Sequence, residues 1–117
     1  MDPSLVTFDY IKQNSGKNPD EVLIDVREPK ELEESGKIPH SINIPLGTLE
    51  NAFSNMPEEQ FKTNYGINKP KKENTIIVHC KMGGRSAKAQ ILLRGLGYTD
   101  VKNYLGGFSD WAKHMEG

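Results

Sequence analysis

Short apolar runs alternate along the chain with segments in which apolar residues recur every three or four positions. The runs predicted as strands are Val22–Val26, Ile42–Ile44, Thr75–His79 and Val101–Leu105. Each is short and nearly continuous, which is typical of a strand that is covered on both faces of a sheet. Strands that alternate with helices predict an α/β fold, with a mostly parallel sheet flanked by helices.

The clearest helix follows the third run. Its residues Ala89, Leu92, Leu93 and Leu96 lie at i, i+3, i+4 and i+7, which forms one apolar face. Gly97 then ends the helix. Other helices are expected from Pro29 to Gly36, in two pieces between Leu46 and Tyr65 with a break near Asn55–Pro57, from Phe108 to His114, and for a short stretch after Thr7, which could cap it.

Length and charge limit the possible functions. At 117 residues, with 35% hydrophobic residues and a net charge of -1, the chain is expected to form a single domain over residues 1–117 with its own core. This charge gives no general reason to expect nucleic acid or a membrane surface as a partner. The basic run Lys69–Lys72 contains a proline and precedes a strand, so we interpret it as a solvated turn.

The cysteine count and the N-terminus bear on the cellular compartment. Cys80 is the only cysteine, so no intramolecular disulfide can form, which fits a reducing compartment. The first residues include Asp2 and Asp9 and no apolar signal core, and no run is long enough to span a membrane. These features predict a cytosolic protein, with mitochondria as the alternative if a leader has been removed.

The segment around this cysteine carries the chemistry. Cys80 lies at the carboxyl end of a predicted strand, in a Gly-rich loop that leads into a helix. Free N–H groups at the start of a helix favour an anion, and so bias a cysteine there toward the thiolate. The residues expected to surround this anion are Lys81, Met82, Gly83, Gly84, Arg85 and Ser86. The glycines allow a sharp turn, the arginine offers a fork of donors and the serine a hydroxyl, none of which an inert buried cysteine needs.

The length of this loop favours sulfur over phosphate. Four residues separate Cys80 from Arg85, one fewer than in the signature of cysteine phosphatases. A tighter ring of N–H groups is better matched to a terminal sulfur on the cysteine than to a phosphate ester. His79 is not expected to serve as a base for Cys80, because adjacent strand residues point to opposite faces. The histidines have no metal-ligand spacing, so no metal site is predicted.

Five segments, taken in order, resemble the rhodanese family of single-domain thiosulfate sulfurtransferases. They are Leu23–Glu28, Gly36–Pro45, Cys80–Ser86, Leu96–Tyr98 and Leu105–Trp111. The departures are Lys37, where the family usually has histidine, and His40, where it usually has glycine. The resemblance implies a three-layer fold with a five-stranded parallel sheet, and neither a metal nor an organic cofactor.

The resemblance also implies a mechanism. The Cys80 thiolate would take a sulfur from a small anionic donor such as thiosulfate, forming a persulfide held by the loop from Lys81 to Ser86. The acceptor would be an external thiol, glutathione or thioredoxin, or cyanide in the test tube. Arg85 would hold the negative charge of the sulfur, Lys81 would attract the donor, and Met82 could contact the acceptor.

Some alternatives stay open. Asp25 and Arg27 lie at another strand end, where they could border the pocket. The interpretation that we favour is structural, with Arg27 paired to Glu31 or Glu34 and Asp25 capping the next turn. For the whole protein, the alternatives are a rhodanese-like module that binds a partner or senses sulfide without catalysis, and a small cysteine phosphatase or arsenate reductase.

Overall fold

The computed structural model describes residues 2–116. Its elements, in chain order, are β1 (Leu5–Val6), α1 (Phe8–Asn14), β2 (Glu21–Asp25), α2 (Pro29–Ser35), β3 (Ile42–Asn43), α3 (Leu46–Ser54), α4 (Glu58–Tyr65), β4 (Thr75–His79), α5 (Gly84–Gly95), β5 (Asp100–Tyr104) and α6 (Gly107–Glu116). Within these residues the strands form one five-stranded sheet in the order β1-β5-β4-β2-β3. Every neighbouring pair is parallel, as the alternation of strands and helices predicted.

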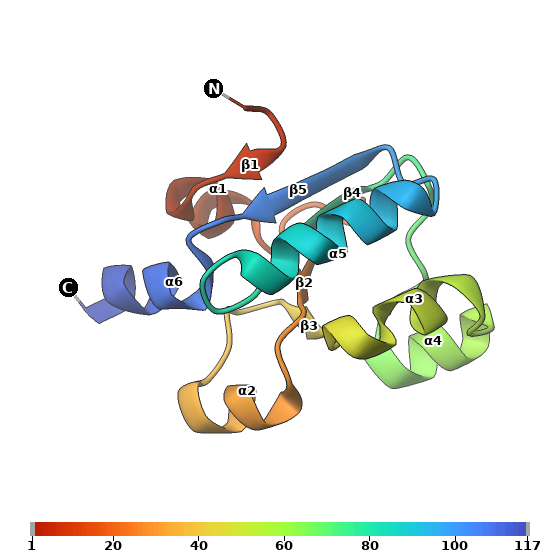
Figure 1. Ribbon diagram of the computed structural model, residues 1–117, viewed down its shortest axis with the longest axis horizontal. Coiled ribbons are helices and arrows are strands. Elements are labelled where there is room, and N and C mark those ends of the chain that lie inside the picture. The colour runs from red at the N-terminus through yellow and green to blue at the C-terminus, as the bar shows by residue number, and fades with distance from the viewer. Residues whose placement is uncertain (1, 117) are drawn as a thin grey trace.

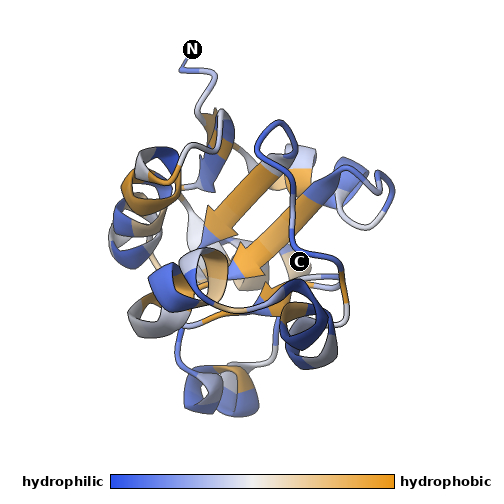
Figure 2. Ribbon diagram, turned by 90° about the vertical axis from the view of Figure 1, so that its right-hand side faces the viewer, coloured by the Kyte–Doolittle hydropathy of each residue, from blue (hydrophilic) through white to orange (hydrophobic). Residues whose placement is uncertain are grey.

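The helices cover the sheet on both faces and give the predicted three-layer α/β fold (Figure 1). One apolar cluster contains buried residues of α3, α4 and α5, packed on one face of the central strands. A second cluster, on the other face, contains Ile11 of α1 and Trp111 of α6. Figure 2 shows the apolar strands in the middle, with the polar sides of the helices around them.

The predicted elements agree closely with the structure. Each predicted strand begins or ends within one residue of the observed one, and the break between α3 and α4 falls at Asn55–Pro57. The strand β1 was not predicted, because two residues are too short to show a periodicity. It pairs with β5, with Leu5 opposite Asn103. Thr7 does precede α1, but its side chain makes no capping hydrogen bond.

The basic run Lys69–Lys72 is more than the solvated turn that the sequence suggested. The Lys69 ammonium donates to the carbonyl oxygens of Phe53 and Met56, at the end of α3. The Lys72 ammonium donates to the carbonyl oxygen of Leu96, just after α5. Cations are favourable at helix carboxyl ends, so this run ties two helices together.

His40 stands where the family usually has glycine, and its backbone explains that preference. It has φ +69°, in the left-handed region that glycine adopts without cost. Histidine is among the side chains that tolerate this region best after glycine. The departure from the family pattern therefore keeps the turn.

Candidate active site

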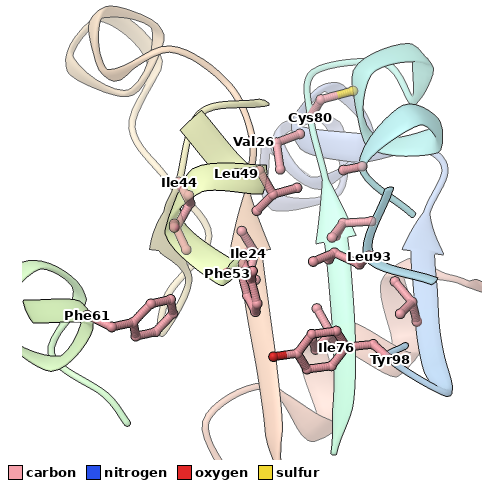
Figure 3. Close-up of a cluster of buried hydrophobic side chains, with 14 residues drawn as sticks. Ile24, Val26, Ile44, Leu49, Phe53, Phe61, Ile76, Cys80, Leu93 and Tyr98 are labelled. Carbon is pink, nitrogen blue, oxygen red and sulfur yellow. The ribbon is translucent and has the colours of Figure 1, made fainter. Parts of the chain in front are cut away.

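Cys80 follows directly after β4 and lies at the end of the larger apolar cluster, beyond Val26 (Figure 3). The residue is only 1% exposed. The backbone N–H of Gly83 donates to Cys80 Sγ at 3.0 Å, and Ser86 Oγ lies 3.5 Å from the same sulfur. The loop thus curls around the thiol.

The surroundings of Cys80 favour the thiolate. Burial by itself raises the pKa of the thiol. The Ser86 hydroxyl and the backbone N–H groups of Ser86, Gly83 and Met82 act against burial and bring the pKa of Cys80 below its ordinary value. The charged form is stabilised by the groups that hold it, which is the condition for a nucleophilic cysteine.

Two glycines allow the chain to close around this loop. Gly83 caps α5 with φ +98°, and a Cβ there would lie 2.7 Å from the carbonyl oxygen of Leu105. Gly107 has φ +65°, and a Cβ there would lie 2.6 Å from the carbonyl oxygen of Cys80. A backbone hydrogen bond holds the start of α6 against the cysteine loop, since Phe108 N–H donates to Cys80 O at 2.8 Å.

This wall of the site was not foreseen from the sequence. The sequence predicted a last helix from Phe108 to His114, whereas in the structure this helix begins at Gly107, which lies against the cysteine loop. The signal that could have found it was a second glycine pair, directly after a strand whose carboxyl end neighbours that of β4.

Arg85 points to a partner that the sequence did not suggest. Its Nη1 and Nη2 donate to the two carboxylate oxygens of Glu31, at 2.6 and 2.9 Å. The two side chains are 36% and 31% exposed, so the pair lies at the rim of the site. Glu31 therefore joins the candidate site from α2, and the expected pairing of Glu31 with Arg27 is wrong.

Asp25 and Arg27 form a buried pair, at 0% and 1% exposure. Arg27 donates through Nε and Nη2 to the Asp25 carboxylate. Its remaining contacts are Ser35 Oγ at 2.8 Å, Gly36 O at 2.9 Å and the ring of Phe108, whose centroid lies 4.3 Å from the guanidinium carbon. The expected partner of Arg27 was Glu31 or Glu34, and this expectation is wrong. Asp25 and Arg27 are two positions apart in an extended stretch, so their side chains lie on the same side of the chain and pair with each other.

The predicted turn cap at Asp25 is present. Its Oδ1 accepts the backbone N–H of Arg27 at 3.0 Å. With both side chains fully engaged inside the protein, the geometry favours the structural interpretation of the pair.

His79 faces away from the thiol, in agreement with the alternation along β4. Its ring packs near Tyr104 in the layer of the smaller cluster, and its Nε2 lies 3.7 Å from Asp25 Oδ2. Burial lowers the pKa of His79, although the nearby Asp25 carboxylate raises it. The geometry gives His79 no direct contact with Sγ through which it could act as a base.

The other loop residues form the outside of the site. Met82 is 74% exposed at the loop tip, and Lys81 and Gly84 are also exposed. Among residues 2–116, no group of three or more His, Cys, Asp or Glu side chains could hold a metal ion. Within the same residues, no helix combines the length and the apolar character needed to cross a membrane.

Comparison with known proteins agrees with this geometry. A family model described as "Rhodanese-like domain" matches residues 7–114. The thiosulfate:glutathione sulfurtransferase of Saccharomyces cerevisiae is 38% identical, over 92% of this chain and 77% of the relative. The mitochondrial thiosulfate sulfurtransferase RDL2 of the same yeast is 34% identical, over 93% of this chain and 72% of the relative.

The solved structures point the same way. The structure of the human single-domain sulfurtransferase TSTD1 superposes with a TM-score of 0.83 at 33% identity, covering 97% of each chain. The chain belongs to the rhodanese family.

Proposed function

We propose that the protein is a sulfurtransferase, which takes the outer sulfur of thiosulfate onto Cys80 and passes it to an external thiol. The observation that carries this proposal is the buried Cys80 Sγ, which accepts the Gly83 N–H at 3.0 Å inside a loop with four residues before Arg85. The names of the yeast and human relatives support sulfur transfer, and two of them specify thiosulfate.

In the first half-reaction the Cys80 thiolate attacks the outer sulfur of thiosulfate. The new S–S bond forms as the bond between the two thiosulfate sulfurs breaks, and the electron pair of that bond leaves with sulfite. The enzyme then carries the persulfide anion Cys80–S–S⁻. A thiol pKa below its ordinary value increases the fraction of the attacking thiolate.

The loop then has to hold a negatively charged sulfur. The backbone N–H groups between Lys81 and Ser86 are the proposed donors, since the Gly83 N–H already points at Sγ. Arg85 contributes charge at the rim, and the exposed Lys81 attracts the dianionic donor mainly by raising its association rate.

In the second half-reaction an acceptor thiolate attacks the terminal sulfur of the persulfide. The bond to Cys80 breaks, and its electron pair restores the Cys80 thiolate. The acceptor comes from another molecule because the sequence contains no second cysteine. Glutathione is the proposed acceptor, because the yeast relative is named for it. Thioredoxin is the alternative external thiol.

The intact mass of the protein tests this mechanism. After incubation with thiosulfate, the wild-type protein is expected to gain the mass of one sulfur atom, and glutathione is expected to remove it. Cys80→Ser should gain nothing under the same conditions. If the wild-type protein takes up no sulfur from thiosulfate or from persulfide donors, the protein is a non-catalytic member of the family. Turnover of an aryl phosphate without sulfur uptake would indicate a phosphatase.

The compartment stays a prediction. The sequence favours the cytosol, and the yeast relative RDL2 is named as mitochondrial. Fractionation of cells that express the native chain would distinguish the two.

A further inference from the structure

The helix α2 is held to the molecule by a few polar contacts. It has no buried residue, and it stands apart from the sheet and the other helices in two perpendicular views (Figures 1 and 2). At its end, Arg27 holds Ser35 Oγ and the carbonyl oxygen of Gly36. At its first turn, Glu31 binds Arg85. The position of this helix is therefore coupled to the cysteine loop through one ion pair.

The carboxylate of Glu31 accepts three hydrogen bonds. Arg85 Nη1 donates to Oε2 at 2.6 Å and Arg85 Nη2 donates to Oε1 at 2.9 Å. The backbone N–H of Glu28 donates to Oε2 at 2.8 Å, which completes a capping box at the start of α2. The hydrogen bond from Arg85 lowers the pKa of Glu31 to about 2, so that the carboxylate is charged at neutral pH.

The ion pair with Glu31 fixes the guanidinium of Arg85 before any substrate binds. The fork to Glu31 uses one N–H on each terminal nitrogen and leaves three of the five donors of the arginine free of that partner. A long side chain that is already ordered loses less freedom when it binds an oxyanion, and it needs less rearrangement as charge develops. The same carboxylate also places a negative charge near the path of a dianionic donor, which weakens binding.

We infer that Glu31 is a positioning residue for sulfur transfer, which acts by holding Arg85 at the rim of the Cys80 loop. This inference rests on the proposed function. It gives Glu31 two opposite effects: the maximal rate of sulfur loading rises because Arg85 is ordered, and the affinity for thiosulfate falls because of the added negative charge.

Glu31→Gln separates these effects from the structural role of the residue. Glutamine at this position of a capping box still accepts the Glu28 N–H, so α2 keeps its cap, while the charged partner of Arg85 is lost. In single-turnover loading from thiosulfate, the maximal rate should fall about tenfold, and the half-saturating thiosulfate concentration should fall as well. Glu34→Gln, an exposed acid on the same helix, is the matched control and should change neither quantity.

A double-mutant cycle tests whether Glu31 acts through Arg85. In an Arg85→Ala background, Glu31→Gln should cause no further loss of maximal loading rate. An equal loss in both backgrounds would overturn the inference, as would a wild-type rate in Glu31→Gln. A fall in rate that follows a lower thermal midpoint, with no change in half-saturation, would identify Glu31 as structural only.

A measurement that needs no activity keeps this inference distinct from the proposed function. In ¹⁵N NMR relaxation, the Nε–H group of Arg85 should be rigid in the wild-type protein and in Glu34→Gln, and mobile in Glu31→Gln. If Arg85 is equally rigid in all three, the positioning role is refuted. If it becomes mobile as expected but the wild-type protein loads no sulfur, the positioning of Arg85 stands and the proposed function fails.

Discussion

At the scale of single residues, the pKa of Cys80 depends on the groups of the loop that follows it, up to Ser86. The thiol is 1% exposed, and such burial would raise the pKa of an isolated cysteine. Here the pKa is lowered instead, because the Ser86 hydroxyl and several backbone N–H groups face the sulfur. The loop therefore favours the anionic form of a buried sulfur.

This balance predicts how the reactivity of Cys80 depends on pH. The rate of alkylation by iodoacetamide follows the thiolate fraction, so in the wild-type protein it should reach half its plateau below the ordinary pKa of a thiol. Ser86→Ala removes the hydroxyl that opposes burial, so the midpoint should move to higher pH. Ser54→Ala, on the exposed end of α3, is the control and should leave the midpoint unchanged. A midpoint that does not move in Ser86→Ala would show that the backbone donors suffice.

At the scale of elements, the site depends on the contact between two loops that follow neighbouring strands. The loop after β4 holds Cys80, and the turn after β5 brings Gly107 against its carbonyl oxygens. The hydrogen bond from Phe108 N–H to Cys80 O fixes the distance between the loops at one point. This contact leaves no room for a side chain at Gly107.

A Gly107→Ala substitution should therefore disturb both loops. The added Cβ would lie 2.6 Å from Cys80 O, and alanine disfavours φ +65°. We expect the free energy of unfolding in urea to fall by about 1–3 kcal/mol. Gly95→Ala is the matched control, because this helical position has nothing within 4 Å of a new Cβ. There the free energy of unfolding should rise by about 0.5–1 kcal/mol. If Gly107→Ala and Gly95→Ala changed the free energy of unfolding alike, the contact between the two loops would not restrict Gly107.

At the scale of the whole molecule, the Asp25–Arg27 pair joins the sheet to the helices at the site. Arg27 follows β2, contacts the end of α2 and covers the Phe108 ring of α6. Both side chains are almost fully buried, so neither charge has water as an alternative partner. Removing one of the two charges leaves the other buried and unpaired, which is costly.

The stability of the fold should reflect this arrangement. Arg27→Met is expected to lower the free energy of unfolding by about 3–5 kcal/mol, as measured by urea denaturation. Adding Asp25→Asn should recover part of this loss, because no buried charge then remains. Lys30→Met, at an exposed position of α2, is the control and should change the stability by no more than about 0.5 kcal/mol. If Arg27→Met lowered the free energy of unfolding by no more than Lys30→Met, a structural role for the Asp25–Arg27 pair would be contradicted.

Much of the fold could be predicted from local patterns. The boundaries of β4 and the break at Asn55–Pro57 were marked by apolar runs, by proline and by polar residues within a few positions. The position of Cys80 between a strand and a helix N-terminus followed from the same signals. The alternation along β4 also placed His79 on the opposite face from the thiol.

The sequence by itself thus determined the order of the elements, the cysteine loop and its length, since these depend on residues that are neighbours in the chain. Only the tertiary structure decided which charged groups meet there. Arg85 and Glu31 are 54 positions apart, and several acids lay within reach of either arginine in the sequence. Asp25 lies beside Arg27 because the two are only two positions apart in an extended stretch of chain. The pairing of Arg85 with Glu31 depends on where the fold places α2 relative to the start of α5. That placement rests on a contact between residues 54 positions apart, which no short segment encodes.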